Sequence, residues 1–265
     1  MSNQAAIDME EQRKKFYTAL QAMKQICEQV NAEEASKQDG NRVIYEVMQL
    51  SELVCKSKIE ASGKTVTTDH YLSQIADFYN ENWLGNKDYM HIPNYSQVMS
   101  NYMKYPIIIA REEQDDEILA ISTIKYDENN PDEIDPYFPD VDAKYFSITG
   151  ILAKRETTHR GMGKKIYEIA LRGAYEYNKH YSGTRIMCVI DCRNAQSLRA
   201  LSAAVERINR DELVGEGQEL PANIVGYYEL RNSQTGELEE APTLVLEVGM
   251  DSQNKGTADI QDKTL

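Results

Sequence analysis

A strand, a polar loop, two glycines and a helix follow one another after residue 143, and this order constrains the fold of the chain more than any other feature. The run Lys144–Ala153 is rich in β-branched and apolar residues, which is typical of a strand. The loop 154–160 then leads to Gly161 and Gly163, after which apolar residues recur at helical spacing: Met162, Ile166, Ile169, Ala170, Ala174 and Tyr177. We therefore expect the loop to end at the N-terminus of a half-buried helix.

A helix that begins at glycines is suited to bind an anion. Its first amides have no partner within the helix, and the helix dipole makes that end positive. Two better-known phosphate motifs do not fit. A Walker loop needs Gly where this chain has Thr158, and Ser or Thr where it has Lys165. A dinucleotide fingerprint that starts at Gly161 needs its third glycine at Ile166. The pattern predicts a phosphate site of another kind.

The segment Thr158-His-Arg-Gly-Met-Gly163 resembles the acetyl-coenzyme A signature of the GNAT family (GCN5-related N-acetyltransferases), Arg/Gln-x-x-Gly-x-Gly/Ala, with Thr158 in place of Arg or Gln. A second block lies at the right distance. The apolar strand 185–190 is followed by Asp191-Cys-Arg-Asn194 and a helix that contains Ser197. This block is similar to the family's strand followed by Asp-x-Arg-Asn-x-x-Ala/Ser. The resemblance spans residues 106–205 and the terminal strands.

The resemblance implies an α/β (α+β) fold. We expect a mixed, mostly antiparallel, twisted sheet of six to seven strands flanked by helices, as in the acyl-CoA N-acyltransferase fold. The sequence pattern predicts strands at 106–110, 117–126, 144–153, 185–190, 223–231 and 243–250, the last two as a hairpin. It also predicts helices at 69–82 and 94–103, where the family has two helices before its second strand.

The chain is expected to have three parts: a helical N-terminal extension (1–62), a GNAT acetyltransferase domain (63–250) and a polar tail (251–265). In the extension we expect one helix from Ile7 to Val30 and another from Arg42 to Lys58, each with one apolar stripe. Neither helix can bury its stripe alone. The pair would form a hairpin on the catalytic domain or the interface of a homodimer, and the sequence leaves both open. The polar stretch 61–68 is a linker or a short first strand.

By the same resemblance, the co-substrate is acetyl-CoA. The family's fourth and fifth strands splay apart, so the end of the fourth strand would bind pantetheine through Ile151, Leu152 and Ala153. The diphosphate would contact the loop and the first helical turn, that is His159, Arg160, Gly161, Met162, Gly163 and Lys164. Asn194 would contact the cofactor, cap the next helix, or do both.

Acetyl transfer to an amine also needs a route for protons. Some relatives carry a carboxylate on the fourth strand, at the position of Ser147, and others a tyrosine at the position of Leu201, so neither family proton carrier is present. The candidate catalytic residues are Ser147, Thr149 and Tyr227. We expect a water relay from Ser147 and Thr149 to a carboxylate of the acidic loop 127–142.

Composition limits the partners. The chain has 43 acidic and 29 basic residues, a net charge of -14, which argues against nucleic acid or anionic membrane as a partner. There is no apolar run long enough to cross a bilayer and no leader pattern, so a cytoplasmic location is expected. The four cysteines lack zinc-site spacing, so free thiols and no metal are expected.

The sequence thus predicts an acetyl-CoA-dependent N-acetyltransferase that moves an acetyl group by direct transfer to a primary amine of a small molecule or a protein. The alternative is a catalytically weak or inactive acyl-CoA-binding module with an interaction role.

Overall fold

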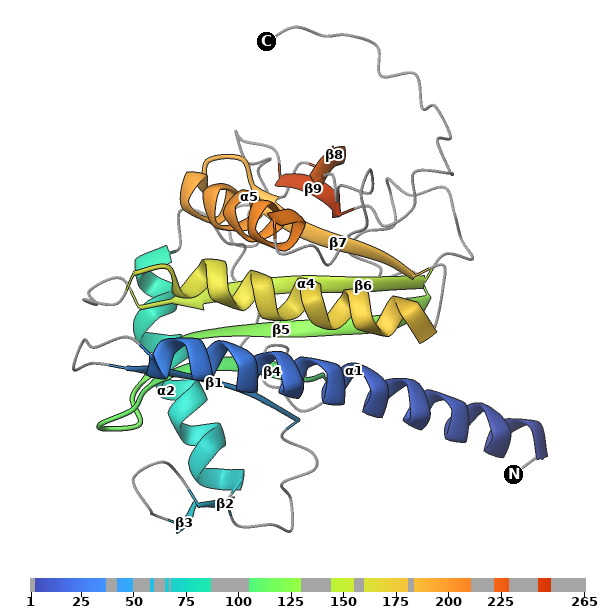
Figure 1. Ribbon diagram of the computed structural model, residues 1–265, viewed down its shortest axis with the longest axis horizontal. Helices are drawn as coiled ribbons and strands as arrows, with labels where there is room; N and C mark the ends of the chain where they lie inside the picture. Colours follow the sequence, from blue (N-terminus) through green and yellow to red (C-terminus); the bar gives the residue numbers. More distant parts are fainter. Residues whose placement is uncertain are drawn as a thin grey trace, which may run out of the picture.

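The computed structural model describes residues 3–36, 42–49, 58–59, 65–66, 68–86, 105–129, 144–154, 160–180, 184–210, 222–228 and 243–248. Within these ranges a 7-stranded sheet has the order β1-β4-β5-β6-β7-β9-β8 (Figure 1). Its strands are β1 (Val43–Met48), β4 (Ile107–Glu112), β5 (Ile118–Asn129), β6 (Lys144–Ala153), β7 (Thr184–Asp191), β8 (Ala222–Tyr228) and β9 (Thr243–Val248). Neighbours are antiparallel except for the pair β6 and β7, which is parallel. The predicted fold class is therefore confirmed.

Three helices cover one face of the sheet: α1 (Asn3–Ala35), α4 (Met162–His180) and α5 (Ala195–Arg210) (Figure 1). Alternate strand residues point to the same face. Phe146 and Ile148 of β6 and Ile186 of β7 thereby join one buried cluster with the apolar side of α4. The ring centroid of Phe146 lies 6.1 Å from that of Tyr177 on α4. This packing fixes α4 along β6.

The opposite face is covered by α2 (Thr68–Asn86), which contacts β5 and β6. Ala110 of β4 belongs to the cluster under α1 and α4, so its neighbour Arg111 points to the other face. There Arg111 Nη1 donates a hydrogen bond to Gln74 Oε1 of α2 at 3.2 Å. The helix expected at 69–82 is thus confirmed, with slightly wider bounds. A separate small sheet is formed by β2 (Lys58–Ile59) and β3 (Thr65–Val66).

The helix expected from Arg42 to Lys58 is wrong where the structure describes it. Residues 43–48 form β1, which pairs with β4 from Val43 opposite Glu112 to Met48 opposite Ile107. Val43, Tyr45 and Val47 are buried while the residues between them are partly exposed, which is the period of a strand. The four-residue spacing of Val43 and Val47 fits both periods, and the β-branched run favours the strand.

The N-terminal helix is longer than predicted and packs tightly on α4. A Cβ atom added at Gly173 of α4 would lie 2.3 Å from Cγ of Met23 on α1, so only glycine permits this approach. The described part of the N-terminal extension therefore shares the core of the sheet. The boundary at residue 62, the helix at 94–103 and the tail 251–265 lie outside the described residues and stay predictions. No described helix is long and apolar enough to span a bilayer.

Candidate functional site

The two parallel strands of the sheet separate partway along their length. Pairing between β6 and β7 runs from Lys144 opposite Thr184 to Ile148 opposite Cys188. Beyond this point β6 continues to Ala153 and β7 to Asp191 without further pairing between them. After residue 148, the edge of β6 that faces β7 thus carries backbone groups that pair with no strand in the described part of the chain, and such an edge is suited to bind an extended ligand.

The other edge of β6 pairs with β5 from Lys144 to Ala153 and contains a bulge. Thr149 lies opposite Thr123 of β5, whereas Leu152 lies opposite Ile121, so β6 has one extra residue in this stretch. Leu152 is buried, and Ile151 and Ala153 are partly buried against the core. The structure therefore places the three predicted pantetheine-binding residues on the separated end of β6. A bulge bends the strand that contains it, and this one lies in the stretch where pairing with β7 has ended.

The start of the loop after β6 is held to β5. The Lys154 amide donates to Leu119 O at 2.8 Å, and Lys154 Nζ forms an ion pair with Glu117. The Lys154 ammonium also donates a hydrogen bond to the Glu117 carboxylate, and this bond raises the pKa of Lys154. Lys154 is thus engaged with β5, and residues 155–159, with the candidate His159, lie outside the described residues.

The far end of the loop turns at a glycine that the backbone requires. Gly161 has φ +83°, a conformation that residues with a side chain rarely adopt. A Cβ atom added at Gly161 would meet no atom within 4 Å, so the space in front of it is open. Arg160 and Gly161 are exposed. The sharp turn therefore presents open backbone at the start of α4.

The first turn of α4 leaves amides available. The Lys165 amide donates to Gly161 O at 3.1 Å and begins the intrahelical pattern. The preceding amides, those of Met162, Gly163 and Lys164, have no acceptor within the helix. The Met162 side chain is buried and anchors the turn, while Lys164 is partly buried. Since the helix dipole is positive at this end, the arrangement favours an anion, as the sequence predicted.

Asn194 caps α5. Its Oδ1 accepts a hydrogen bond from the Ser197 amide at 3.0 Å, and its carbonyl oxygen accepts from the Leu198 amide at 3.1 Å. The capping role, one of the two predicted, is confirmed. Asn194 is partly buried and follows β7, so it lies beyond the end of the strand that separates from β6.

The three candidate catalytic residues lie on two strands. Ser147 is opposite Met187 in the parallel pair, just before the strands separate. Its side chain is buried, and its Oγ has no hydrogen-bond partner among the described residues. Thr149 lies just beyond the last pair.

Tyr227 is on β8, at the far edge of the sheet, opposite Leu244 of β9, which in turn lies opposite Ile190 of β7. Tyr227 is therefore level with Ile190, in the part of the sheet where β6 and β7 no longer pair. At about 4.8 Å per strand, the backbones of β8 and β7 are roughly 10 Å apart.

Sequence reasoning missed a group of charges behind the first turn of α4. Glu168 of α4 is 1% exposed, and Lys165, Arg172 and Arg207 contact its carboxylate. Glu33 of α1 joins the same group. The spacing of Lys165, Glu168 and Arg172 along one helical face is a signal for ion pairing. Nothing in the local sequence indicates the partners on α1 and α5.

Comparisons with solved structures find several chains of similar fold that are named acetyltransferases. The ribosomal-protein-S5-alanine acetyltransferase from Vibrio fischeri is 11% identical over 82% of this chain and 96% of its own, with a TM-score of 0.46. The GNAT-family acetyltransferase from Streptococcus pneumoniae is 11% identical over 78% and 98%, with a TM-score of 0.42. The yncA protein from Salmonella typhimurium, whose structure contains its cofactor acetyl-CoA, is 13% identical over 71% and 94%, with a TM-score of 0.44.

At these identities the likeness concerns the fold alone. No protein-family model matches the chain, and no curated protein matches it. We therefore base the function on the residues and geometry of the site.

Proposed function

We propose that this chain is an acetyl-CoA-dependent N-acetyltransferase that transfers the acetyl group directly to a primary amine. One observation carries the proposal. The parallel strands β6 and β7 stop pairing after Ile148 and Cys188, beside a helix whose N-terminus is reached through a glycine at φ +83°. An open strand edge and a free helix N-terminus, joined by one short loop, suit a ligand with an amide-bearing arm and a diphosphate.

Coenzyme A has both parts. Its pantetheine arm carries amide groups that would extend the sheet along the edge of β6 at Ile151, Leu152 and Ala153. Its diphosphate would accept hydrogen bonds from the first amides of α4. Arg160, exposed, and Lys164, partly buried, flank these amides and would add charge. The open space in front of Gly161 leaves room for the phosphate oxygens. His159 lies outside the described residues, and its contact with the diphosphate stays a prediction.

Bound acetyl-CoA supplies the activated thioester, and the chain must position the amine and move its proton. Ser147 lies at the base of the separated strands with a buried hydroxyl that has no described partner. We assign it, with Thr149, to hold a water that passes the proton to a carboxylate of the segment 127–142, which was expected to be a loop but whose residues 127–129 belong to β5. Tyr227 remains the candidate proton donor to the departing thiolate.

Lys125 of β5 bears on the protonation of the acceptor. It lies opposite Ser147 in the antiparallel pair, so both side chains are on the face that α2 covers. Its ammonium is 5.9 Å from the ring centroid of Tyr105. A cation next to the reaction centre lowers the pKa of an acceptor amine and increases its neutral, nucleophilic fraction.

The second candidate is an acyl-CoA-binding module without turnover. Ser147 cannot accept a proton unaided, and Leu201, at the position of the family's tyrosine acid, is 1% exposed within the apolar core. These two differences from the family pattern favour the binding module. Three properties stay predictions. They are the acceptor, which is a small molecule or a protein, the oligomeric state, for which a homodimer is the expectation to test, and the cytoplasmic location.

Thiol release from acetyl-CoA distinguishes the candidates. The full chain is mixed with acetyl-CoA and a panel that contains a polyamine, an aminoglycoside, free amino acids and peptides with a free N-terminus or lysine. Calorimetry with CoA runs in parallel. Binding with amine-dependent thiol release supports the acetyltransferase. Binding with no release for any amine supports the module, and no CoA binding at all rejects both.

A further inference from the structure

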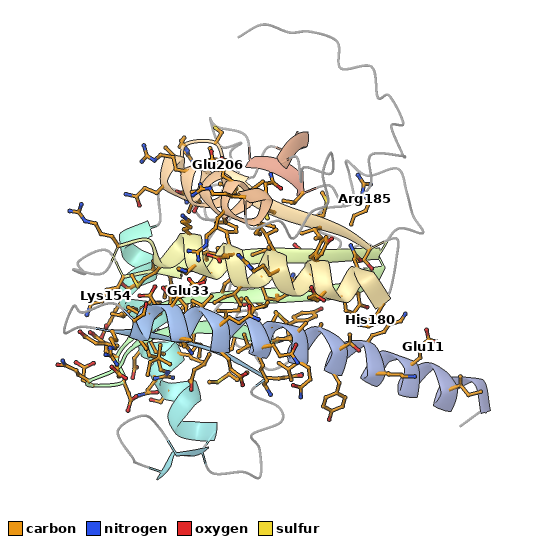
Figure 2. All side chains as sticks on the ribbon, in the orientation of Figure 1. Glu11, Glu33, Lys154, His180, Arg185 and Glu206 are labelled. Carbon is orange, nitrogen blue, oxygen red and sulfur yellow. The ribbon has the colours of Figure 1, made fainter. Side chains whose placement is uncertain are left out.

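A closed ring of charges joins α1, α4 and α5 behind the first turn of α4. Glu33 Oε2 of α1 accepts hydrogen bonds from Lys165 Nζ at 3.0 Å and from Arg207 Nη2 at 2.6 Å. Glu168 closes the ring, with Oε1 3.1 Å from Arg207 Nε and Oε2 3.6 Å from Lys165 Nζ. Arg172 Nη2 lies 3.2 Å from Glu168 Oε1. Figure 2 shows Glu33 where α1 runs beside α4.

The members of the ring differ in burial. The side chain of Glu168 is 1% exposed and that of Lys165 is 11% exposed, whereas that of Glu33 is 48% exposed. Buried ion pairs add little net stability but fix geometry, since each charge must keep its partner. Partial burial raises the pKa of Glu33, yet hydrogen bonds from Lys165 and Arg207 outweigh that effect and the pKa is lowered. Glu33 is therefore ionised at neutral pH.

The ring is attached to the turn that would hold the diphosphate. Lys165 is the residue whose amide begins the intrahelical pattern at Gly161, and it directly follows Lys164. Its side chain therefore ties the first turn of α4 to Glu33 of α1, which also binds Arg207 of α5. Further along, the contact of Gly173 with Met23 prevents α1 from sliding on α4. α1 thus contacts α4 at two places, at the first turn through Lys165 and further along the helix at Gly173.

We propose that Glu33 is a positioning residue for the coenzyme diphosphate, and this inference rests on the proposed function. By binding Lys165 and Arg207 together, Glu33 holds the first amides of α4 in the geometry that an anion needs. It acts through Lys165 and not by contact, because a carboxylate that touched the diphosphate would repel it. A carboxylate in the last turn of α1 also opposes the helix dipole, and Lys165 and Arg207 offset that unfavourable interaction.

The test compares Glu33→Gln with Glu28→Gln, which makes the same charge change at an exposed position of α1. Calorimetry measures the Kd of each protein for CoA and for pantetheine, which lacks the diphosphate. For Glu33→Gln we expect a loss of CoA affinity of about tenfold, because small misplacements of binding groups are costly. Its pantetheine affinity should be unchanged, and Glu28→Gln should match the wild type with both ligands.

A general loosening of the fold would weaken both ligands alike, and that outcome would overturn the positioning role. Unchanged CoA affinity would also overturn it. Tighter CoA binding would do so as well, because it would show Glu33 to be a competing anion. If the wild type does not bind CoA, the proposed function fails first. Arg207→Lys is the second variant. It keeps the charge but cannot reach both carboxylates, so we expect the same selective loss, to a smaller extent.

Discussion

Replacing Gly161 by alanine tests the turn on which the proposed coenzyme site depends. Gly161 has φ +83°, and a residue with a Cβ atom pays about 1–2 kcal/mol to adopt that region. The added methyl group would meet no atom within 4 Å, so the cost is backbone strain and not a clash. For a chain of this size, we expect Tm to fall by roughly 2–8 °C.

The chain offers a matched control two residues on. Gly163 lies within α4, and a Cβ atom there would be 3.7 Å from Cβ of Ala200, an ordinary contact. Gly163→Ala should therefore raise stability by about 0.5–1 kcal/mol, as expected for Gly to Ala inside a helix. Gly161→Asn should lose less than Gly161→Ala, because asparagine tolerates the left-handed region better.

Thermal unfolding followed by circular dichroism gives the stability of the three variants, and calorimetry gives their affinity for CoA. Gly161→Ala should weaken CoA binding, since relief of the strain moves the amides that follow. Gly161→Val, with a β-branched side chain, should abolish it in a protein that still folds. If Gly161→Ala and Gly163→Ala have equal stability and equal CoA affinity, the turn does not have the role that we derive from φ.

Three further outcomes follow from the described contacts. Gly173→Ala should lower Tm, because its Cβ would lie 2.3 Å from Met23 Cγ, and the added substitution Met23→Ala should recover part of the loss. Asn194→Ala should destabilise the protein by about 1 kcal/mol in denaturant unfolding through loss of the Ser197 cap. Burial raises the pKa of the Cys188 thiol from 9.0 to about 12. The folded state holds this proton more tightly than the unfolded chain does. The contribution of the Cys188 thiol to the free energy of unfolding is therefore complete below pH 9 and declines as pH rises toward 12. Alkylation of Cys188 should therefore be slow at pH 8 in the native protein and fast after unfolding, as mass spectrometry can measure.

The elements closest to the site were the most predictable from sequence. The strand Lys144–Ala153 has the predicted bounds, and α4 begins at Met162, right after the glycine that the pattern singled out. Asn194 caps the helix that it was expected to begin. These are local signals, since strand composition, helical spacing and capping residues act over a few neighbours. The structure adds the φ of Gly161, which explains why glycine is needed there.

The failures came from contacts between distant segments. Val43 and Val47 fit a helical stripe as well as a strand; the β-branched residues favour the strand, and pairing with β4 fixes it. Glu33 lies 132 residues before its partner Lys165, so no local pattern connects them. Edge strands and ion pairs of this kind depend on tertiary structure, which overrides propensity.

The composition of the site explains why its side chains identify the acceptor so poorly. Most of the groups assigned to the coenzyme are backbone: the free edge of β6, the turn at Gly161 and the first amides of α4. Backbone groups are present whatever the side chains are, provided that the turn, the bulge and the helix start are kept. Under the proposed function, coenzyme binding constrains few residues, whereas proton transfer depends on particular side chains, and Ser147 and Leu201 differ from the family pattern that the sequence resembles. For that reason CoA affinity and amine-dependent thiol release must be measured separately, because the first can persist when the second is lost.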